Sequence, residues 1–517
     1  MPSRAQLGLE APLVQIEAHL GSGLPGFSIV GLPAPVVRES RERVRSAILN
    51  SGYEFPAGRI TVNLAPVELA KEGGRYDLPI ALALLIASGQ LRVIREPAPE
   101  CFGELGLAGE LRPVRGLLLA AIHATRAGHD MVIPLEDYAE VRLVRQQGVA
   151  GLPDLRAVCG FLGRADRPAA QASERAAEPA QGSRAEHRII PNVNQYGTLD
   201  EVKGQWRAKR ALAIAAAGGH SLLMVGPPGS GKSMLASRLV ALLPPLAEQE
   251  AMEVAGIASI GPQGFDPARW GQRPFRSPHH AASASAIVGG GARLRAGEIS
   301  LAHHGVLFLD ELPEYDRRVL EALREPLEAG VITIARADAR LELPAQFQLV
   351  AAMNPCPCGY LGDARRACTC SARRVQRYRE RISGPLLDRI DLQIEVPRVE
   401  LQSLSAVPGE VDAAQLGARV VAARSRQQQR QQTCNARLDH AGLSSHCRVD
   451  STVRSLLLRI GETQGISARG YHRLLKVART IADLDGLEEI GVAQIGEAAS
   501  YRPNAGSTPA SSTPFGL

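Results

Sequence analysis

A glycine-rich segment with one lysine and one terminal hydroxyl lies near the middle of the chain. Residues 226–233 read Gly-Pro-Pro-Gly-Ser-Gly-Lys-Ser. Glycines let backbone N–H groups close around phosphate oxygens, a lysine at this spacing neutralises β- and γ-phosphates, and the following hydroxyl is a magnesium ligand. A plain turn before a helix is the alternative. The predicted phosphate-binding residues are Gly226, Pro227, Pro228, Gly229, Ser230, Gly231, Lys232 and Ser233.

Two adjacent carboxylates follow an apolar strand pattern later in the chain. Val306–Leu309 is the apolar run, and Asp310 and Glu311 follow it. An aspartate here is placed to hold the water shell of a magnesium ion, and a glutamate to activate the attacking water. Together with Ser233 as the second magnesium ligand, this pattern predicts hydrolysis of ATP with Mg²⁺ as cofactor.

Two further polar residues stand at the ends of apolar segments. Asn354 closes the buried-strand pattern 349–353, where it could lie between the two nucleotide strands and orient the lytic water. An asparagine that opens a turn before Pro355 fits the same local sequence. Arg389 lies among apolar residues, and an ordinary solvated or salt-bridged side chain fits its local sequence as well.

Four cysteines directly follow Asn354 as two C-x-C pairs separated by nine residues: Cys356, Cys358, Cys368 and Cys370. Four thiolates fit tetrahedral zinc, and the intervening segment is long enough to loop back. The pairs are tighter than the usual C-x₂-C spacing, so four free thiols are the alternative. The other cysteines show no such grouping.

Changes in composition and in apolar pattern divide the 517-residue chain into five parts. We predict an α+β domain at 1–160, a flexible linker at 161–190 and an α/β P-loop core at 191–400, followed by a helical region at 401–500 and a disordered tail at 501–517. Within the first part, 27–30 and 60–64 have strand patterns and 36–50 and 78–87 have helical ones.

Composition narrows the class of protein. The hydrophobic content of 45% is that of a globular chain, and no apolar run is long enough for a membrane span. Because the N-terminus has no signal-peptide pattern, we expect a cytoplasmic location. The net charge of +6 permits a polyanionic partner without requiring one.

Several longer motifs resemble the magnesium-chelatase-like AAA+ ATPases of the ComM/YifB group, over nearly all of the chain from Leu7 to about Ala499. The motifs that carry the resemblance are 31–33 (Gly-Leu-Pro), 61–66 (Thr-Val-Asn-Leu-Ala-Pro), 71–79 (Lys-Glu-Gly-Gly-Arg-Tyr-Asp-Leu-Pro), 276–280 (Arg-Ser-Pro-His-His), 297–303 (Gly-Glu-Ile-Ser-Leu-Ala-His) and 477–484 (Val-Ala-Arg-Thr-Ile-Ala-Asp-Leu).

The resemblance implies a AAA+ core and a helical C-terminal lid. It implies that Asn354 is the sensor after the central strand, that Arg389 is the arginine finger offered to a neighbouring subunit, and that Arg469 is the lid sensor touching the γ-phosphate. A finger supplied by a neighbour implies a ring, usually a hexamer. Such fingers contribute about 10³ to 10⁵ in rate, so a monomer is expected to hydrolyse ATP poorly.

Two insertions resemble the elements that line the pore of related rings, at 276–298 (helix-2 insertion) and 331–343 (pre-sensor hairpin). They imply contacts with nucleic-acid phosphates, with solvated surface as the alternative. Paired histidines could also ligate a metal, but no carboxylate or cysteine stands near them in sequence. The candidate contact residues are His279, His280, Arg293, Arg295, Arg336 and Arg340.

The N-terminal domain resembles the proteolytic domain of Lon without its chemistry. The corresponding loop at 73–77 has no serine, and no lysine occurs from 72 to 202. Because that chemistry needs both groups, we expect no peptidase activity. The domain is interpreted instead as a platform for ring stacking or DNA contact.

The resemblance implies a ring-forming motor that acts on single-stranded and branched DNA. Its expected role is as a helicase promoting branch migration during recombination and natural transformation, with recombination proteins as candidate partners. One alternative is a magnesium-chelatase motor subunit, against which the Lon-like domain and the cysteines stand. The other is an ATPase that remodels proteins.

Overall fold

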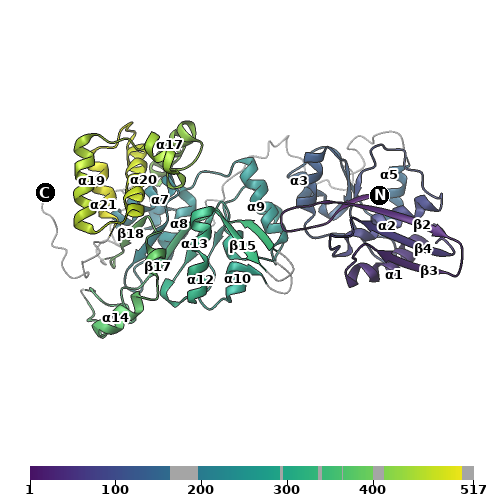
Figure 1. Cartoon of the computed structure of the whole chain (residues 1–517), viewed down its shortest axis with the longest axis horizontal. Coiled ribbons are helices and arrows are strands. Elements are labelled where there is room, and N and C mark those ends of the chain that lie inside the picture. The colour runs from purple at the N-terminus through teal and green to yellow at the C-terminus, as the bar shows by residue number, and fades with distance from the viewer. Residues whose placement is uncertain (164–195, 291–294, 336–339, 364, 400–412, 503–517) are drawn as a thin grey trace. The chain divides into compact units, whose positions relative to one another are not determined.

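The computed structural model describes residues 1–163, 196–290, 295–335, 340–363, 365–399 and 413–502, which form two compact units (Figure 1). The first unit contains the described residues up to 163 together with 248–270, and the second contains the remainder. Most of the predicted linker at 161–190 and of the predicted tail at 501–517 lies outside the described residues.

The first unit is an α+β domain with two main sheets. A four-stranded sheet has the order β1-β2-β4-β3, and a parallel three-stranded sheet has the order β5-β8-β9. The strand patterns at 27–30 and 60–64 are confirmed by β3 and β4. The strands of this unit are β1 (Pro2–Arg4), β2 (Leu13–Gly21), β3 (Gly26–Val30), β4 (Arg59–Ala65), β5 (Glu100–Cys101), β6 (Glu104–Leu105), β7 (Leu111–Arg112), β8 (Met131–Pro134) and β9 (Val149–Leu152).

Helices complete this unit, and one of them comes from a distant part of the sequence. The helices are α1 (Pro35–Asn50), α2 (Asp77–Ala87), α3 (Leu117–Ala127), α4 (Tyr138–Arg142), α5 (Leu155–Leu162) and α9 (Glu248–Ile260). Although α9 falls within the range 191–400 assigned to the P-loop core, its small apolar face packs on α3. A Cβ on Gly256 would lie only 2.8 Å from Leu119 Cδ2, so the two helices approach closely. This packing groups α9 with the first unit.

The second unit is built on a parallel five-stranded sheet of order β11-β14-β17-β10-β18. Its inner strands are continuous apolar runs because helices bury both faces. The parallel order brings the carboxyl ends of β10, β14 and β17 to one edge, where ligands of such sheets bind. The strands are β10 (Leu222–Val225), β11 (Phe275–Arg276), β14 (Val306–Leu309), β17 (Gln348–Met353) and β18 (Leu392–Glu395).

Short helices and two hairpins surround the sheet. Antiparallel strands β15 and β16 occupy the range where the pre-sensor hairpin was predicted, and β12 and β13 form a hairpin within the 276–298 insertion. The helices are α7 (Trp206–Gly218), α8 (Lys232–Leu242), α10 (Ala284–Val288), α11 (Glu298–Leu301), α12 (Arg317–Ala322), α13 (Arg324–Ala329), α14 (Ala372–Arg379) and α15 (Gly384–Leu387). The hairpin strands are β12 (Gly289–Gly290), β13 (Arg295–Ala296), β15 (Val331–Ala335) and β16 (Arg340–Pro344).

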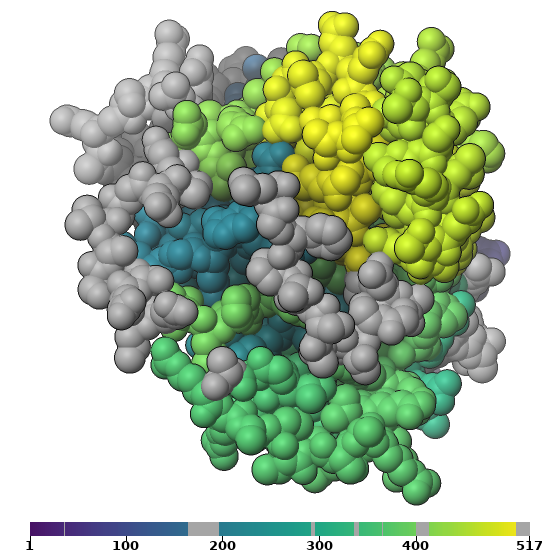
Figure 2. Space-filling model, turned by 90° about the vertical axis from the view of Figure 1, so that its left-hand side faces the viewer, coloured from purple at the N-terminus to yellow at the C-terminus, as the bar shows by residue number. Residues whose placement is uncertain are grey.

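Five helices close the C-terminal part: α17 (Ala413–Gln431), α18 (His440–His446), α19 (Ser451–Gln464), α20 (Ala468–Asp485) and α21 (Val492–Ser500). The apolar faces of these helices join one hydrophobic core with α7, α8 and the sheet. Figure 2 shows these helices in yellow on one part of the surface and the green segment containing α14 on another.

None of the helices in the described part of the chain combines the length and the apolar character needed to cross a bilayer.

Candidate functional site

The phosphate-binding loop connects the carboxyl end of β10 to the first residue of α8. Gly229 and Gly231 have φ angles of +75° and +86°, which a residue with a side chain adopts only under strain. A Cβ on Gly226 would lie 2.1 Å from the Val396 carbonyl oxygen, so only glycine fits there. The buried Ser230 hydroxyl has no hydrogen-bond partner in the described structure. These features fit a loop that closes around phosphate oxygens.

The Lys232 ammonium group lies inside the curve of this loop. Its Nζ donates hydrogen bonds to the carbonyl oxygens of Gly226 at 2.7 Å and Pro227 at 3.0 Å, and to Asn354 Oδ1 at 3.4 Å. Burial lowers the pKa of Lys232, and the charges of Asp310 and Glu311 oppose that shift. A phosphate group offers stronger, charge-assisted partners than these carbonyls.

Ser233 and Asp310 meet at the metal side of the loop. The Ser233 hydroxyl donates to Asp310 Oδ2 over 2.7 Å. A hydroxyl and a carboxylate oxygen are hard ligands of the kind that Mg²⁺ takes together with water and phosphate oxygens. The residues present therefore fit a bound magnesium ion.

Replacing Ser233 by alanine is expected to raise the Mg²⁺ concentration for half-maximal ATP turnover by about tenfold or more, because one ligand is lost. Ser237→Ala is the matched control, since its hydroxyl lies on the same helix and bonds to the Met234 carbonyl oxygen and Arg238 Nη1 rather than to Asp310. Titration of turnover against Mg²⁺ at fixed ATP measures both. An unchanged Mg²⁺ requirement in Ser233→Ala would remove this residue from the metal site.

Glu311 begins the turn after β14 with a φ angle of +53°, a strained value for a non-glycine residue. Its backbone N–H donates to Asp310 Oδ1 at 2.9 Å, and its carboxylate lies 3.2 Å from His280 Nδ1. The Glu311 side chain is 50% exposed, so water reaches it. This geometry leaves the carboxylate free to act on a water molecule while His280 limits its orientation.

These groups line one cavity of about 360 Å³ that contains residues 228–234, Asp310, Glu311, Met353 and Asn354. Asn354 follows β17, the strand between β10 and β14, which is why it faces Lys232. A second cavity of about 460 Å³ shares residues 228–231 and Met234 with the first. The loop thus borders two cavities that share five lining residues.

The second cavity contains residues that the sequence reasoning missed, from Glu201 to Gln205. The Gln205 side chain donates to the Ser230 carbonyl oxygen at 2.8 Å, tying this segment to the phosphate loop. One local signal was present in the sequence, because Thr198 and Glu201 form a capping box at the start of a short 3₁₀ helix (Leu199–Glu201).

Arg389 and Arg469 do not line either nucleotide cavity of their own chain. Both contact one carboxylate, with Glu328 Oε1 lying 2.8 Å from Arg389 Nη2 and 2.9 Å from Arg469 Nη2. Burial tends to raise the pKa of Glu328, but the bond from Arg389 and the charge of Arg469 hold it below its usual range. Three residues that the sequence separates widely thus form one cluster.

This cluster lines a separate cavity of about 510 Å³ in the second unit. The Arg389 side chain is 5% exposed and also donates to the Pro385 carbonyl oxygen, while its buried Nε has no partner in the described structure. Arg389 is therefore not the freely exposed group expected of a finger. The charged lining residues are Glu328, Arg389, Asp391, Arg437, Asp439, Arg469, Arg473 and Lys476.

The candidate nucleic-acid contacts are scattered by the fold. His280 lies beside Glu311, and the His279 ring lies next to that of His280, tilted, with a centroid separation of 4.2 Å. The carboxylate absent from the neighbouring sequence is thus supplied by the turn after β14. Arg295 is exposed in β13 and Arg340 begins β16, whereas Arg293 and Arg336 lie outside the described residues.

The loop at 73–77 in the first unit holds buried charges and no nucleophile. Asp77 pairs with Arg43 at 2.7 Å, and burial raises the pKa of Asp77 to about 6. Arg75 is buried and donates to the side chain of Gln6 at 3.1 Å. These contacts fix the packing of α1 and α2.

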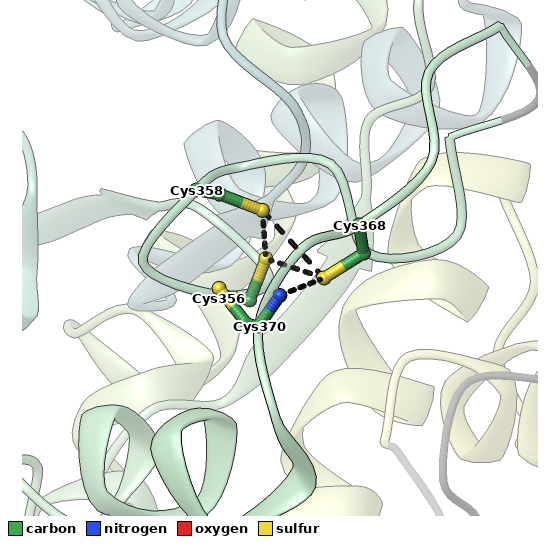
Figure 3. A group of neighbouring side chains, drawn as sticks. All are labelled: Cys356, Cys358, Cys368 and Cys370. Carbon is green, nitrogen blue, oxygen red and sulfur yellow. Dashed lines mark hydrogen bonds between the residues drawn. The ribbon is translucent and has the colours of Figure 1, made fainter.

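The structure also brings the four cysteines of the C-x-C pairs together. Their sulfur atoms all lie within 4.8 Å of one another (Figure 3), directly after Asn354 in the chain.

Comparison with known proteins places these features in a family. Residues 198–404 match the model of magnesium chelatase subunit ChlI, residues 16–137 match a ChlI subunit domain and residues 410–502 match the ChlI C-terminal domain. The protein YifB of Salmonella typhimurium is 49% identical over 97% of this chain and 96% of its own length. YifB of Escherichia coli is 48% identical and competence protein ComM of Haemophilus influenzae is 46% identical, each with the same coverage. The chain therefore belongs to the magnesium-chelatase ChlI-like family, whose members are AAA ATPases, and has YifB and ComM among its close homologues.

Proposed function

We propose that this chain is an ATP-driven DNA motor that works as a ring of identical subunits. The observation that carries the proposal is the separation of the catalytic groups. Lys232, Asp310 and Glu311 line one cavity. Arg389 and Arg469 line a different cavity, whose lining includes no residue of the phosphate loop. A complete site then forms when the arginine cavity of one subunit meets the phosphate loop of the next.

Within this proposal each group has a distinct role. Lys232 and the loop amides bind the phosphates, Ser233 and Asp310 hold Mg²⁺, and Asn354 and Glu311 orient and activate water. When bound, the magnesium ion neutralises charge between the β- and γ-phosphates. Arg389 and Arg469 of the neighbouring subunit stabilise the charge that develops on the transferred phosphoryl group.

Glu328 is proposed to neutralise both arginines until a neighbour arrives. Its Oε1 accepts from both guanidinium groups, and the Glu328 side chain is 41% exposed, so a polyphosphate can compete with it.

Glu328→Gln is expected to lower the protein concentration for half-maximal ATPase activity by about 2- to 5-fold, since partly exposed ion pairs are individually weak. Glu325→Gln on the same helix α13 is the control, because its carboxylate bonds to Thr333 rather than to arginine. ATPase rate against protein concentration measures the effect. A shift to higher concentration would mean that Glu328 positions the arginines instead of restraining them.

The DNA role rests on the relative from Haemophilus influenzae, which is named as competence protein ComM. We propose branch migration on single-stranded and branched DNA during recombination, from a hexameric ring whose N-terminal domain is Lon-like and non-proteolytic. The test is incubation of the purified full chain with ATP, Mg²⁺ and forked or four-way DNA, with Glu311→Gln as the hydrolysis-deficient control. Absence of strand movement, with no effect of DNA on oligomeric state, would refute the motor.

A chelatase motor subunit is the second candidate, because the matching family models are those of chelatase subunit ChlI. The two candidates differ in what stimulates hydrolysis. A DNA motor responds to DNA alone, whereas a chelatase subunit requires partner subunits and a porphyrin. ATPase measurements with and without each component distinguish them.

A further inference from the structure

We propose that Cys356, Cys358, Cys368 and Cys370 bind one zinc ion, and that this ion holds the loop that packs against the phosphate loop at Pro228. Zinc binding stands on the cysteine geometry alone. Its effect on nucleotide binding rests on the proposed ATPase function.

Three of the sulfur atoms have nearly the spacing of a tetrahedral cage, and the Cys370 sulfur lies within 4.8 Å of each of them. Cys356 Sγ lies 3.4 Å from Cys358 Sγ and 3.6 Å from Cys368 Sγ, and the Cys358 and Cys368 sulfurs are 3.6 Å apart. Zinc–thiolate bonds of about 2.3 Å put tetrahedral sulfurs roughly 3.8 Å apart. In a disulfide the two sulfur atoms are about 2.05 Å apart, so these separations are those of thiols rather than of a disulfide. Figure 3 shows the thiols of Cys356, Cys358 and Cys368 pointing toward one another, with Cys370 beside them.

A backbone N–H group points at one of the sulfurs. The N–H of Cys370 donates to Cys368 Sγ at 3.4 Å. Such outer donors stabilise metal-bound thiolates. Four-sulfur tetrahedral sites hold zinc or iron–sulfur clusters, and the short sulfur separations leave room for a single ion. Zinc is therefore the ion that fits.

Besides the cysteines, the loop is held mainly by polar contacts at its surface, such as the ion pair of Asp363 with Arg398 at 3.1 Å and the Arg366 guanidinium over the Tyr360 ring. Between Met353 and Ala372 the described residues form neither helix nor strand, and few of their side chains are buried. A segment that buries so little apolar surface gains order from a metal cross-link, because binding free energy becomes folding free energy.

Gly359, in the middle of this loop, contacts the phosphate loop. It has a φ angle of +84°, and a Cβ there would lie 2.6 Å from Pro228 Cδ and 3.8 Å from Asn354 Cγ. Asn354 is in turn 3.4 Å from Lys232 Nζ. The metal-bound loop thus supports both the phosphate loop and the sensor asparagine.

Metal content of the full chain, purified without chelators, tests the first half of the proposal. We expect about one zinc per chain in the unaltered protein and in Cys434→Ser, whose cysteine lies outside the cluster. In Cys368→Ser/Cys370→Ser we expect less than about one tenth of that content. Co²⁺ loaded in place of zinc should give the absorption of tetrahedral thiolate coordination. If the purified protein contains no zinc and takes up neither zinc nor Co²⁺ on titration, the proposed metal site is wrong.

Equilibrium binding of a fluorescent ATP analogue in the Glu311→Gln background tests the second half. After metal depletion and removal of the chelator, affinity should fall by about tenfold and return when zinc is added. Gly359→Ala should keep its zinc and still lose affinity, because the added Cβ displaces Pro228. This variant separates unfolding of the cysteine loop from the loss of its contact with the phosphate loop.

The outcomes are distinguishable. Unchanged affinity in both the depleted protein and Gly359→Ala would overturn the coupling, even if zinc is present. If the zinc-loaded protein fails to bind ATP at all, the proposed ATPase fails, while the zinc stoichiometry still decides the metal site.

Discussion

Arg389→Ala is expected to lower the ATP turnover of the assembled protein by about 10³-fold or more, the range found for arginine fingers in related phosphoryl-transfer enzymes. Nucleotide affinity should change little, because Arg389 does not line the cavity of its own phosphate loop. Steady-state ATPase assays and equilibrium nucleotide binding on the same preparation measure the two quantities.

The control for Arg389→Ala is Arg419→Ala, which removes an ion pair with Asp485 among the C-terminal helices and touches neither cavity. It should leave turnover close to that of the unaltered protein. A parallel loss of affinity and turnover in Arg389→Ala would show that the arginine supports the fold or its own pocket. The assignment as a finger would then fail.

Glu311→Gln is expected to reduce turnover by about 10²- to 10⁴-fold, the usual contribution of a positioned general base. ATP affinity should be retained, because the amide keeps the size of the side chain while losing its basicity. Single-turnover measurements with bound ATP isolate the chemical step. Glu314→Gln, an exposed neighbour that pairs with Arg381, serves as the control.

Should Glu311→Gln turn over ATP at a rate near that of Glu314→Gln, another group must activate the water. His280 would then be the next residue to test, since its Nδ1 lies 3.2 Å from the Glu311 carboxylate.

The phosphate loop and its carboxylates were predictable because their chemistry is local. The loop conformation fixes the positions of Lys232 and Ser233, and the glycines at 229 and 231 predict the positive φ angles that the loop adopts. Asp310 reaches Ser233 because parallel strands deliver their ends to one edge, a rule of topology that sequence patterns carry. The same rule places Asn354.

Contacts that depend on tertiary packing could not be predicted from the sequence. Nothing near Arg389 or Arg469 indicates that both share Glu328, because helix α13 meets them only in the folded second unit. His280 was interpreted as a nucleic-acid contact from its place in the 276–298 insertion, and its contact with Glu311, which follows β14, arises only in the folded chain. Helix α9 was assigned to the P-loop core by position, although its small side chains suit packing on α3.

The most direct test of the central claim is ATPase activity after mixing Arg389→Ala with Glu311→Gln, in rings shown by native mass spectrometry to contain both. Each variant alone should be nearly inactive. When the two variants are mixed in equal amounts, about a quarter of the sites in random rings pair an intact Glu311 with an intact Arg389 from the neighbour. The activity of the mixture should therefore rise toward that fraction of the unaltered rate. Mixed rings with no gain in activity at any ratio would contradict a site shared between subunits.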